Sequence, residues 1–132
     1  MAFKGREIIV QTITMIANEA VSRGACLEIS SSEAGETDSD EATYGVALED
    51  ADDGALVRIA VGPGNIVKCL AHDSSITEGE WVTPEDDGRV DGIGGLTGGT
   101  QYPLGIALQA SSAQDQLIPV LMMPHVSTKA ET

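Results

Sequence analysis

The four-residue phrase Gly45-Val46-Ala47-Leu48 occurs a second time, with one conservative change, as Gly105-Ile106-Ala107-Leu108. A short polar stretch and a second apolar run follow each copy. Residues 56–61 read Leu-Val-Arg-Ile-Ala-Val, and residues 117–122 read Leu-Ile-Pro-Val-Leu-Met. Short apolar runs separated by turns are typical of β-strands. The recurrence predicts a unit of about 55–60 residues that is present twice.

A second repeated feature lies upstream of each phrase. Val21-Ser22-Arg23-Gly24 precedes Cys26-Leu27, and Ile76-Thr77-Glu78-Gly79 precedes Trp81-Val82. The turn Gly62-Pro63-Gly64-Asn65 is the sharpest break between the two copies. We therefore expect four parts, which are an N-terminal arm with the first strand (1–16), a first β repeat (17–61), a second β repeat (62–124) and a flexible polar tail (125–132).

The composition favours an all-β fold with an aliphatic core. The chain has 132 residues, of which 42% are hydrophobic and only 3% aromatic. Two halves of this kind bury little surface separately and gain from packing together or from packing against other chains. The predicted fold is two similar small lobes, barrel-like or sandwich-like, with an extended N-terminal arm. The expected core residues are Val46, Leu48, Val57, Ile59, Ile106, Leu108 and Val120.

Three segments carry specific expectations. Residues 7–16 are rich in Ile, Val and Thr, which favours a strand, although a helix over 7–22 competes because Ile9, Ile13 and Ile16 would share one face. Residues 31–43 contain almost no apolar side chain and are expected to be an exposed loop. Pro119 predicts an edge strand or a bulge in the last apolar run.

The charge argues against nucleic acid and anionic membrane as partners. The formal net charge is −14 and the pI is about 4.1, whereas phosphate binding needs clustered Lys and Arg. Nine carboxylates gather in residues 31–53, and we expect them to face solvent: Glu33, Glu36, Asp38, Asp40, Glu41, Glu49, Asp50, Asp52 and Asp53. The only basic cluster lies in the N-terminal arm, at Lys4 and Arg6 beside the single phenylalanine, Phe3. This arm is the predicted docking element.

The sequence offers no chemical signature of an enzyme. The glycine-rich stretch 92–100 lacks the Lys-Ser or Lys-Thr pair of a phosphate-binding loop and is not followed by a helical pattern. His72 and His125 lack zinc-type partners, and the acidic turn at 49–53 lacks the glycine and the glutamate of a calcium loop. We predict no catalytic, cofactor-binding or metal-binding residue, and no cofactor.

The two cysteines indicate a structural role and a reducing compartment. Cys69 alternates with apolar neighbours and is expected to be a small core residue, and neither Cys26 nor Cys69 lies in an electropositive setting. No secretory signal or apolar run of membrane-spanning length is visible. The single tryptophan, Trp81, starts a short strand and is either a packing residue or an anchor at a subunit contact.

The repeated pattern resembles the small capsid decoration proteins of tailed bacteriophages, which are also called cement or head-stabilising proteins. The pattern is Val/Ile-x-x-Gly-x-x-Val/Leu, then Gly-Val/Ile-Ala-Leu, then a hairpin that ends in an apolar strand. The matching residues are Val21, Gly24, Leu27 and 45–48 in the first copy, and Ile76, Gly79, Val82 and 105–108 in the second.

The resemblance implies a non-enzymatic structural protein. It implies homotrimers on the outside of a phage head, assembled in the host cytoplasm, that bind the major capsid protein through an extended terminus and stabilise its contacts. Two alternatives stay open at this point. One is a β-domain that binds a small molecule or carries a group on Lys68, although Lys68 lies inside an expected strand. The other is a trimer similar to nucleotide pyrophosphatases, suggested by Gly88-Arg89-Val90-Asp91-Gly92.

Overall fold

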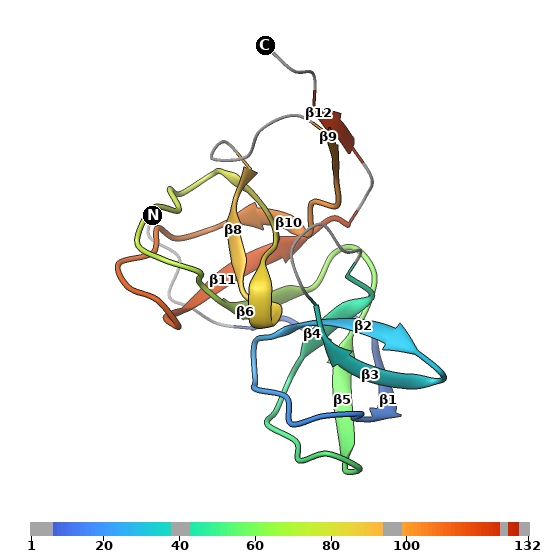
Figure 1. The fold of residues 1–132 in the computed structure, drawn as a ribbon. Helices are drawn as coiled ribbons and strands as arrows, with labels where there is room; N and C mark the ends of the chain where they lie inside the picture. Colours follow the sequence, from blue (N-terminus) through green and yellow to red (C-terminus); the bar gives the residue numbers. More distant parts are fainter. Residues whose placement is uncertain (1–6, 38–42, 94–98, 125–126, 130–132) are drawn as a thin grey trace.

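The computed structural model describes residues 7–37, 43–93, 99–124 and 127–129. Two five-stranded antiparallel sheets dominate these residues and lie one beside the other (Figure 1). The first sheet has the order β1 (Thr12–Ile16), β5 (Leu56–Ala60), β4 (Gly45–Ala47), β2 (Cys26–Ser30) and β3 (Glu33–Glu36). The second has the order β6 (Ile66–Leu70), β11 (Leu117–Met122), β10 (Gly105–Ala107), β7 (Trp81–Pro84) and β8 (Val90–Gly92).

Two smaller elements complete the described fold. A 3₁₀ turn, η1 (Asp86–Gly88), joins β7 to β8. The strands β9 (Gly99–Gln101) and β12 (Ser127–Lys129) pair as a separate ribbon, which projects beyond the second sheet in Figure 1. The expected flexible tail at 125–132 therefore contains a strand. The all-β prediction is confirmed, but neither sheet closes into a barrel.

The two sheets have the same connectivity. If β6, β7, β8, β10 and β11 are numbered one to five, both sheets read 1-5-4-2-3. The hydrogen bonds between loops repeat as well. The Gly24 N–H donates to the Ala47 carbonyl over 2.9 Å, and the Gly79 N–H donates to the Ala107 carbonyl over 2.8 Å. In this arrangement β1 belongs to the first sheet, whereas the sequence-based division set it apart with the arm. The repeat boundaries near residues 17 and 62 remain a prediction.

The first residue of the repeated phrase is glycine because two strands approach closely there. A Cβ atom on Gly45 would lie 2.5 Å from the Ala60 carbonyl oxygen of β5. A Cβ atom on Gly105 would collide with the Leu121 carbonyl of β11 and lie 3.1 Å from the Met122 Cα. Real Cβ atoms do not come this close to backbone. The phrase thus marks the central strand of each sheet, β4 or β10, where its neighbour packs against it.

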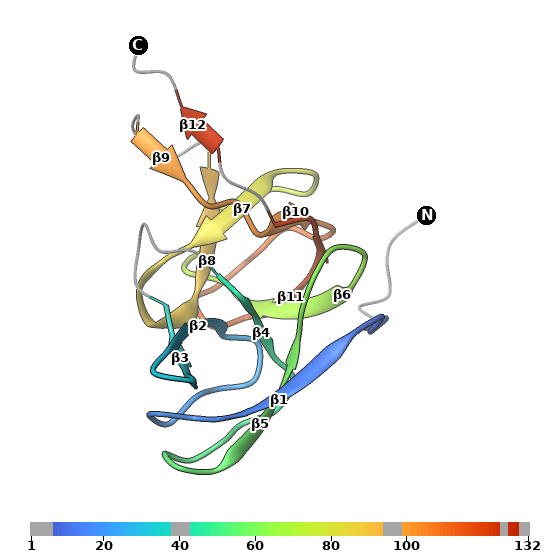
Figure 2. The same ribbon diagram turned by 90° about the vertical axis from the view of Figure 1, so that its right-hand side faces the viewer.

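One hydrophobic cluster holds the two sheets together. It combines Cys26, Val46 and Ala60 of the first sheet with a larger set from the second, including Val67 and Val120. A second cluster is centred on the first sheet, around Val57 and Ile59, and Leu70 of β6 packs against it. The sheets therefore share a continuous core. Figure 2 shows the two sheets packed next to each other. Burial of aliphatic side chains at this junction supplies the stability that each half lacks separately.

The expected core is confirmed for the inward residues of the central strands. Val46, Val57, Ile59 and Val120 are at most 1% exposed. Leu48 packs against the shared cluster but is only half-buried. The prediction is wrong for Ile106 and Leu108, which are half-buried. Ile106 pairs with Trp81 and Leu121, which are also half-buried, because this row lies on the outer face of the second sheet.

Two predictions about local structure are wrong. The expected loop 31–43 contains β3, because Ser31 and Ser32 both adopt positive φ, at 52° and 65°, and form a tight hairpin turn. Ala34 of β3 is fully buried. Pro119 lies in β11, which is an internal strand. The proline nitrogen, which has no N–H, faces the chain just beyond the end of β10, so no hydrogen bond of the β10–β11 ladder is lost. The Pro119 carbonyl still accepts the Leu108 N–H over 2.9 Å.

The first apolar segment adopts the expected strand conformation. Residues Thr12–Ile16 form β1 and pair with β5 over five residues, from Thr12 with Ala60 to Ile16 with Leu56. The competing helix over 7–22 is wrong. A run rich in β-branched side chains fits a pleated strand better than a helix because χ1 is restricted.

Candidate docking surface

The largest exposed apolar side chains gather around β1. Six of the eight in the described residues lie on β1, on the segment before it, or on the paired end of β5; these are Ile8, Ile9, Val10, Ile13, Ile16 and Leu56. Val10 and Leu56 are the most exposed, at 68% and 67%. We call this set the β1 strip. Figure 2 shows that β1 and β5 form the outer side of the first sheet. Exposed apolar side chains that gather along one strand are typical of an interaction site.

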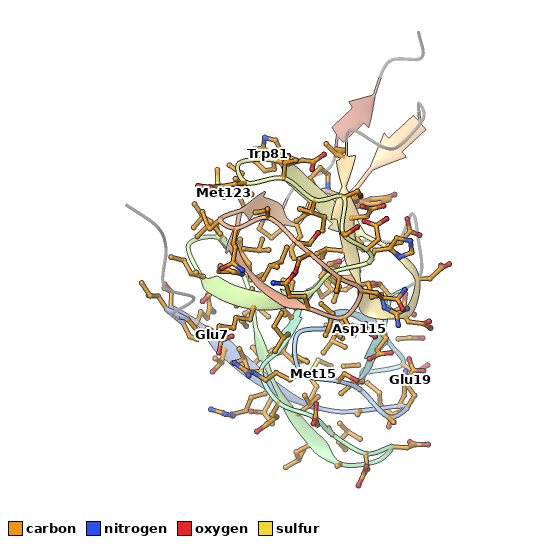
Figure 3. The ribbon with its side chains drawn as sticks, turned by 90° about the vertical axis from the view of Figure 1, so that its left-hand side faces the viewer. Glu7, Met15, Glu19, Trp81, Asp115 and Met123 are labelled. Atoms are coloured by element: carbon orange, nitrogen blue, oxygen red, sulfur yellow. The ribbon has the colours of Figure 1, made fainter. Side chains whose placement is uncertain are left out.

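The β1 strip is uncharged although the protein is strongly acidic. No charged residue occurs between Glu7 and Glu19, which lie near opposite ends of β1; Figure 3 labels both. The turn between β4 and β5 adds exposed carboxylates at Asp50, Asp52 and Asp53. The strip is therefore an apolar band bordered by negative charge.

Ion pairs occupy the arginines of the described residues. Arg23 contacts Glu7 over 2.9 Å, Arg58 contacts Glu49 over 3.4 Å, and Arg89 contacts Asp115 over 2.7 Å. The Arg89 guanidinium donates two hydrogen bonds to Asp115 and holds the pKa of that carboxyl below its ordinary value. Exposed pairs of this kind stabilise little. The pairs offset the arginine charges, although the side chains of Arg23 and Arg58 stay 40% and 59% exposed, so the field around the strip stays negative.

The sequence-predicted docking residues Phe3, Lys4 and Arg6 lie outside the described residues. Trp81 is placed at the start of β7 and is half-buried. It begins a row of half-buried apolar side chains on the outer face of the second sheet, which continues across the strands through Ile106, Leu121 and Ile66. Trp81 and Met123, which is 40% exposed, are labelled at the same end of the molecule in Figure 3.

Neither cysteine has the environment of a reactive thiol. Both are free and fully buried in the shared core. Burial raises the pKa of the Cys26 thiol to about 12 and raises that of Cys69 well above its ordinary value. A thiolate is therefore strongly disfavoured at either position. The expectation that Cys69 is a core residue is confirmed.

One group of possible metal ligands lies beside β8. Side-chain ligand atoms of His72, Asp73 and Asp91 lie within 4.8 Å of one another. Sequence reasoning did not connect Asp91 with His72; the structure brings Asp91 beside His72 and Asp73 because Ala71 and Val90 form a parallel bridge. The carboxylates already serve local structure: Asp73 accepts the Ser75 N–H over 2.8 Å, and Asp91 accepts the Gly92 N–H over 2.8 Å.

The structure places Lys68 unfavourably for a carried group. It lies in the middle of β6, paired with Pro119, and is half-buried. Group carriers present a lysine at a hairpin tip, so the geometry does not favour that alternative. The described residues also contain no helix with the length and hydropathy needed to cross a membrane.

The geometry defines a class of structural protein that acts through its binding surfaces. A rigid β scaffold carries an exposed apolar strip and an acidic exterior, and its thiols are buried. The comparisons agree with this. The model of the phage cement protein family matches residues 6–122, so the chain belongs to that family. It is a structural, non-enzymatic component of the virion head that decorates the capsid and binds capsid protein.

A solved structure shares the fold. The N-terminal base of the head fibre gp8.5 of bacteriophage phi29 superposes with a TM-score of 0.65 at 17% sequence identity. The superposition covers 89% of this chain and 95% of that one. A comparison with curated proteins finds no match.

Proposed function

We propose that this cement protein binds the outside of the phage head as a homotrimer and stabilises contacts between neighbouring major capsid subunits. The observation that carries the proposal is the family match combined with a net charge of −14. The packaged genome makes the interior of a head strongly negative, which disfavours an acidic protein there. The similar phi29 protein is the base of a head fibre, and its fold supports an exterior position.

The N-terminal arm is the proposed contact with the capsid. Phe3 offers an apolar anchor beside the cations Lys4 and Arg6, which suit an acidic or mixed surface. Deletion of residues 1–6 should preserve the melting temperature, because the described sheets begin at Thr12. It should weaken co-sedimentation with heads assembled without the cement protein. Equal binding by the truncated and the full-length protein would contradict this role.

Trp81 is the proposed subunit contact. The apolar row that it begins on the outer face of the second sheet can be buried against another copy, since exposed aromatic side chains are enriched at interfaces. The acidic side chains Asp50, Asp52 and Asp53 are exposed and belong at the periphery, because copies of them would repel at a threefold axis.

Sedimentation velocity tests the trimer. The isolated protein should sediment as a trimer at micromolar concentration, and its mass should change little with salt, because apolar burial rather than charge holds it together. Trp81→Ala should shift the population toward monomer. A wild-type monomer at high micromolar concentration would refute a preformed trimer. An unchanged trimer in Trp81→Ala, with the exposed Leu56→Ala as a matched control, would refute the proposed contact.

A further inference from the structure

The two sheets have the same connectivity but differ at the outer edge of their first strand, β1 or β6. β1 pairs with β5 on one side only. At its ends, the Gln11 carbonyl accepts the Val61 N–H over 3.1 Å, and the Ala17 N–H donates to the Ala55 carbonyl over 2.8 Å. Backbone direction alternates along an antiparallel strand. The N–H and C=O groups that point away from β5 are therefore those of Thr12, Thr14 and Ile16.

The equivalent edge, on β6, is closed by the protein itself. The outward N–H groups of β6 belong to Ile66, Lys68 and Leu70; they donate to the Ile8 carbonyl over 2.8 Å, the Glu7 carboxylate over 3.1 Å and the Gly24 carbonyl over 3.0 Å. The Ile66 carbonyl also accepts the Ile8 N–H over 2.9 Å. An extended segment thus covers this edge in strand fashion.

The edge of β1 has no such cover in the described part of the chain. No hydrogen bond to the outward backbone groups of Thr12 or Thr14 is present there, whereas the parallel bridge of Ala17 with Ala34 engages the Ile16 carbonyl. Contact between β1 and β3 is limited to its far end, where Ala17 bridges Ala34. An open edge with apolar side chains is a template for another strand, and soluble proteins usually block such edges. Here Ile13 and Ile16 remain 37% and 43% exposed on the same strand.

The charge distribution selects the kind of strand that fits. The edge itself is uncharged, and Glu7 and Glu19 flank it. A second copy at this edge would place its own Glu7 and Glu19 beside the same flanking carboxylates, so self-association through β1 is disfavoured. A segment with apolar side chains at alternate positions and Lys or Arg at its ends matches both the strip and its borders. A cement protein binds capsid subunits, so the capsid protein is the candidate source of such a segment.

We propose that β1 is a docking edge, to which the capsid protein adds an extended segment as a sixth strand of the first sheet. The backbone groups of Thr12 and Thr14 and the Ile16 N–H would provide the main-chain hydrogen bonds, and the β1 strip would provide the apolar contact. This mode is β-strand addition, in which the main chain gives affinity and side-chain pockets give specificity. The inference rests on the proposed binding to the outside of the head and names a second surface, besides the N-terminal arm, that contacts the capsid.

Thr14→Pro tests the edge directly. Proline removes the outward N–H of residue 14 and places its ring at the edge, while the bonds from residues 13 and 15 to β5 stay intact. Thr14→Ala is the matched control, because it shortens the side chain and keeps the N–H. In co-sedimentation titrations with heads assembled without the cement protein, Thr14→Pro should lose about tenfold or more in affinity. Thr14→Ala should stay within about twofold.

The outcomes separate this inference from the function on which it rests. If wild-type protein fails to bind heads, the proposed function fails first. If wild type binds and a folded Thr14→Pro binds equally, only the docking edge is refuted. If Thr14→Pro does not fold, hydrogen exchange on wild-type protein decides: the amides of residues 12, 14 and 16 should become protected on head binding, and unchanged exchange would overturn the proposal. Protection that already exists in the free protein and depends on its concentration would assign the edge to a second copy instead.

Discussion

Gly105→Ala is the sharpest test of the strand packing that the repeated phrase encodes. Gly105 lies in β10, between β11 and β7. An added Cβ would collide with the Leu121 carbonyl, and it would lie 2.8 Å from the Leu121 carbonyl carbon and 3.1 Å from the Met122 Cα. All three obstacles are backbone atoms of β11. No side-chain rotation can relieve the collision, so β10 and β11 must move apart.

The cost follows from overpacking and from weakened strand pairing. Inserting a methyl group into a packed site costs about 1–3 kcal/mol. Separation also strains the two flanking hydrogen bonds, from Met123 N–H to the Leu104 carbonyl at 2.8 Å and from Leu108 N–H to the Pro119 carbonyl at 2.9 Å. Each is worth about 1 kcal/mol net. We expect a total loss of about 3–5 kcal/mol in the free energy of unfolding, a large share of the stability of a small protein.

Urea unfolding followed by tryptophan fluorescence measures this loss, because Trp81 pairs directly with β10. Gly79→Ala is the matched control. Gly79 has a φ of +86° and no neighbouring heavy atom within 4 Å of an added Cβ, so that substitution should cost only about 1–2 kcal/mol from backbone conformation. Equal losses in the two variants would show that close strand approach does not constrain Gly105, and the explanation of the phrase would be wrong.

Three further predictions concern the core and its titrating groups. Val57→Asp places a charge at a fully buried position and should cost several kcal/mol, about 3–5, so an unchanged melting temperature would exclude Val57 from the core. Partial burial raises the pKa of Glu36; the folded protein then binds this proton more tightly than the unfolded chain, so stability falls as pH rises through the interval just above 4.5. Glu36→Gln should flatten that part of the stability profile, and an identical profile would contradict the cause. Cys26 and Cys69 should react with a thiol reagent in denaturant but not in the native protein, whose burial raises both pKa values; rapid native labelling would show that the shared core opens.

The features that could be predicted from the sequence are those with a periodic or repeated signal. The doubled phrase located β4 and β10, and alternation in residues 56–61 located β5 and its inward side chains Val57 and Ile59. β3 escaped because its four residues, Glu33–Glu36, include two carboxylates and a glycine. Pairing with β2 and burial of Ala34 determine that strand. Neither can be predicted from the pattern of a polar sequence.

The candidate docking surface was only partly accessible to sequence reasoning. The basic arm could be identified by its charge. The sequence of the β1 strip predicted a strand, but it did not show whether the apolar residues of that strand are buried or exposed. Its exposure depends on which edge of the sheet the strand occupies, and that is a property of the tertiary fold. The group of His72, Asp73 and Asp91 likewise depends on a bridge between distant segments.

The short segment between the two sheets explains how one chain closes one edge and leaves the other open. Ile8 pairs with Ile66 of the second sheet, and β1 of the first sheet begins at Thr12. The buried side chain of Asn65 fixes this crossing: its oxygen accepts the Val10 N–H over 2.6 Å, and its amide group donates to two carbonyls of the preceding turn. The segment that covers β6 at Ile8 continues directly into β1 at Thr12, so it cannot also cover the edge of β1. In the described part of the chain no other strand lies along Thr12 and Thr14, so the arrangement that joins the two sheets leaves this stretch of edge open to the proposed capsid segment.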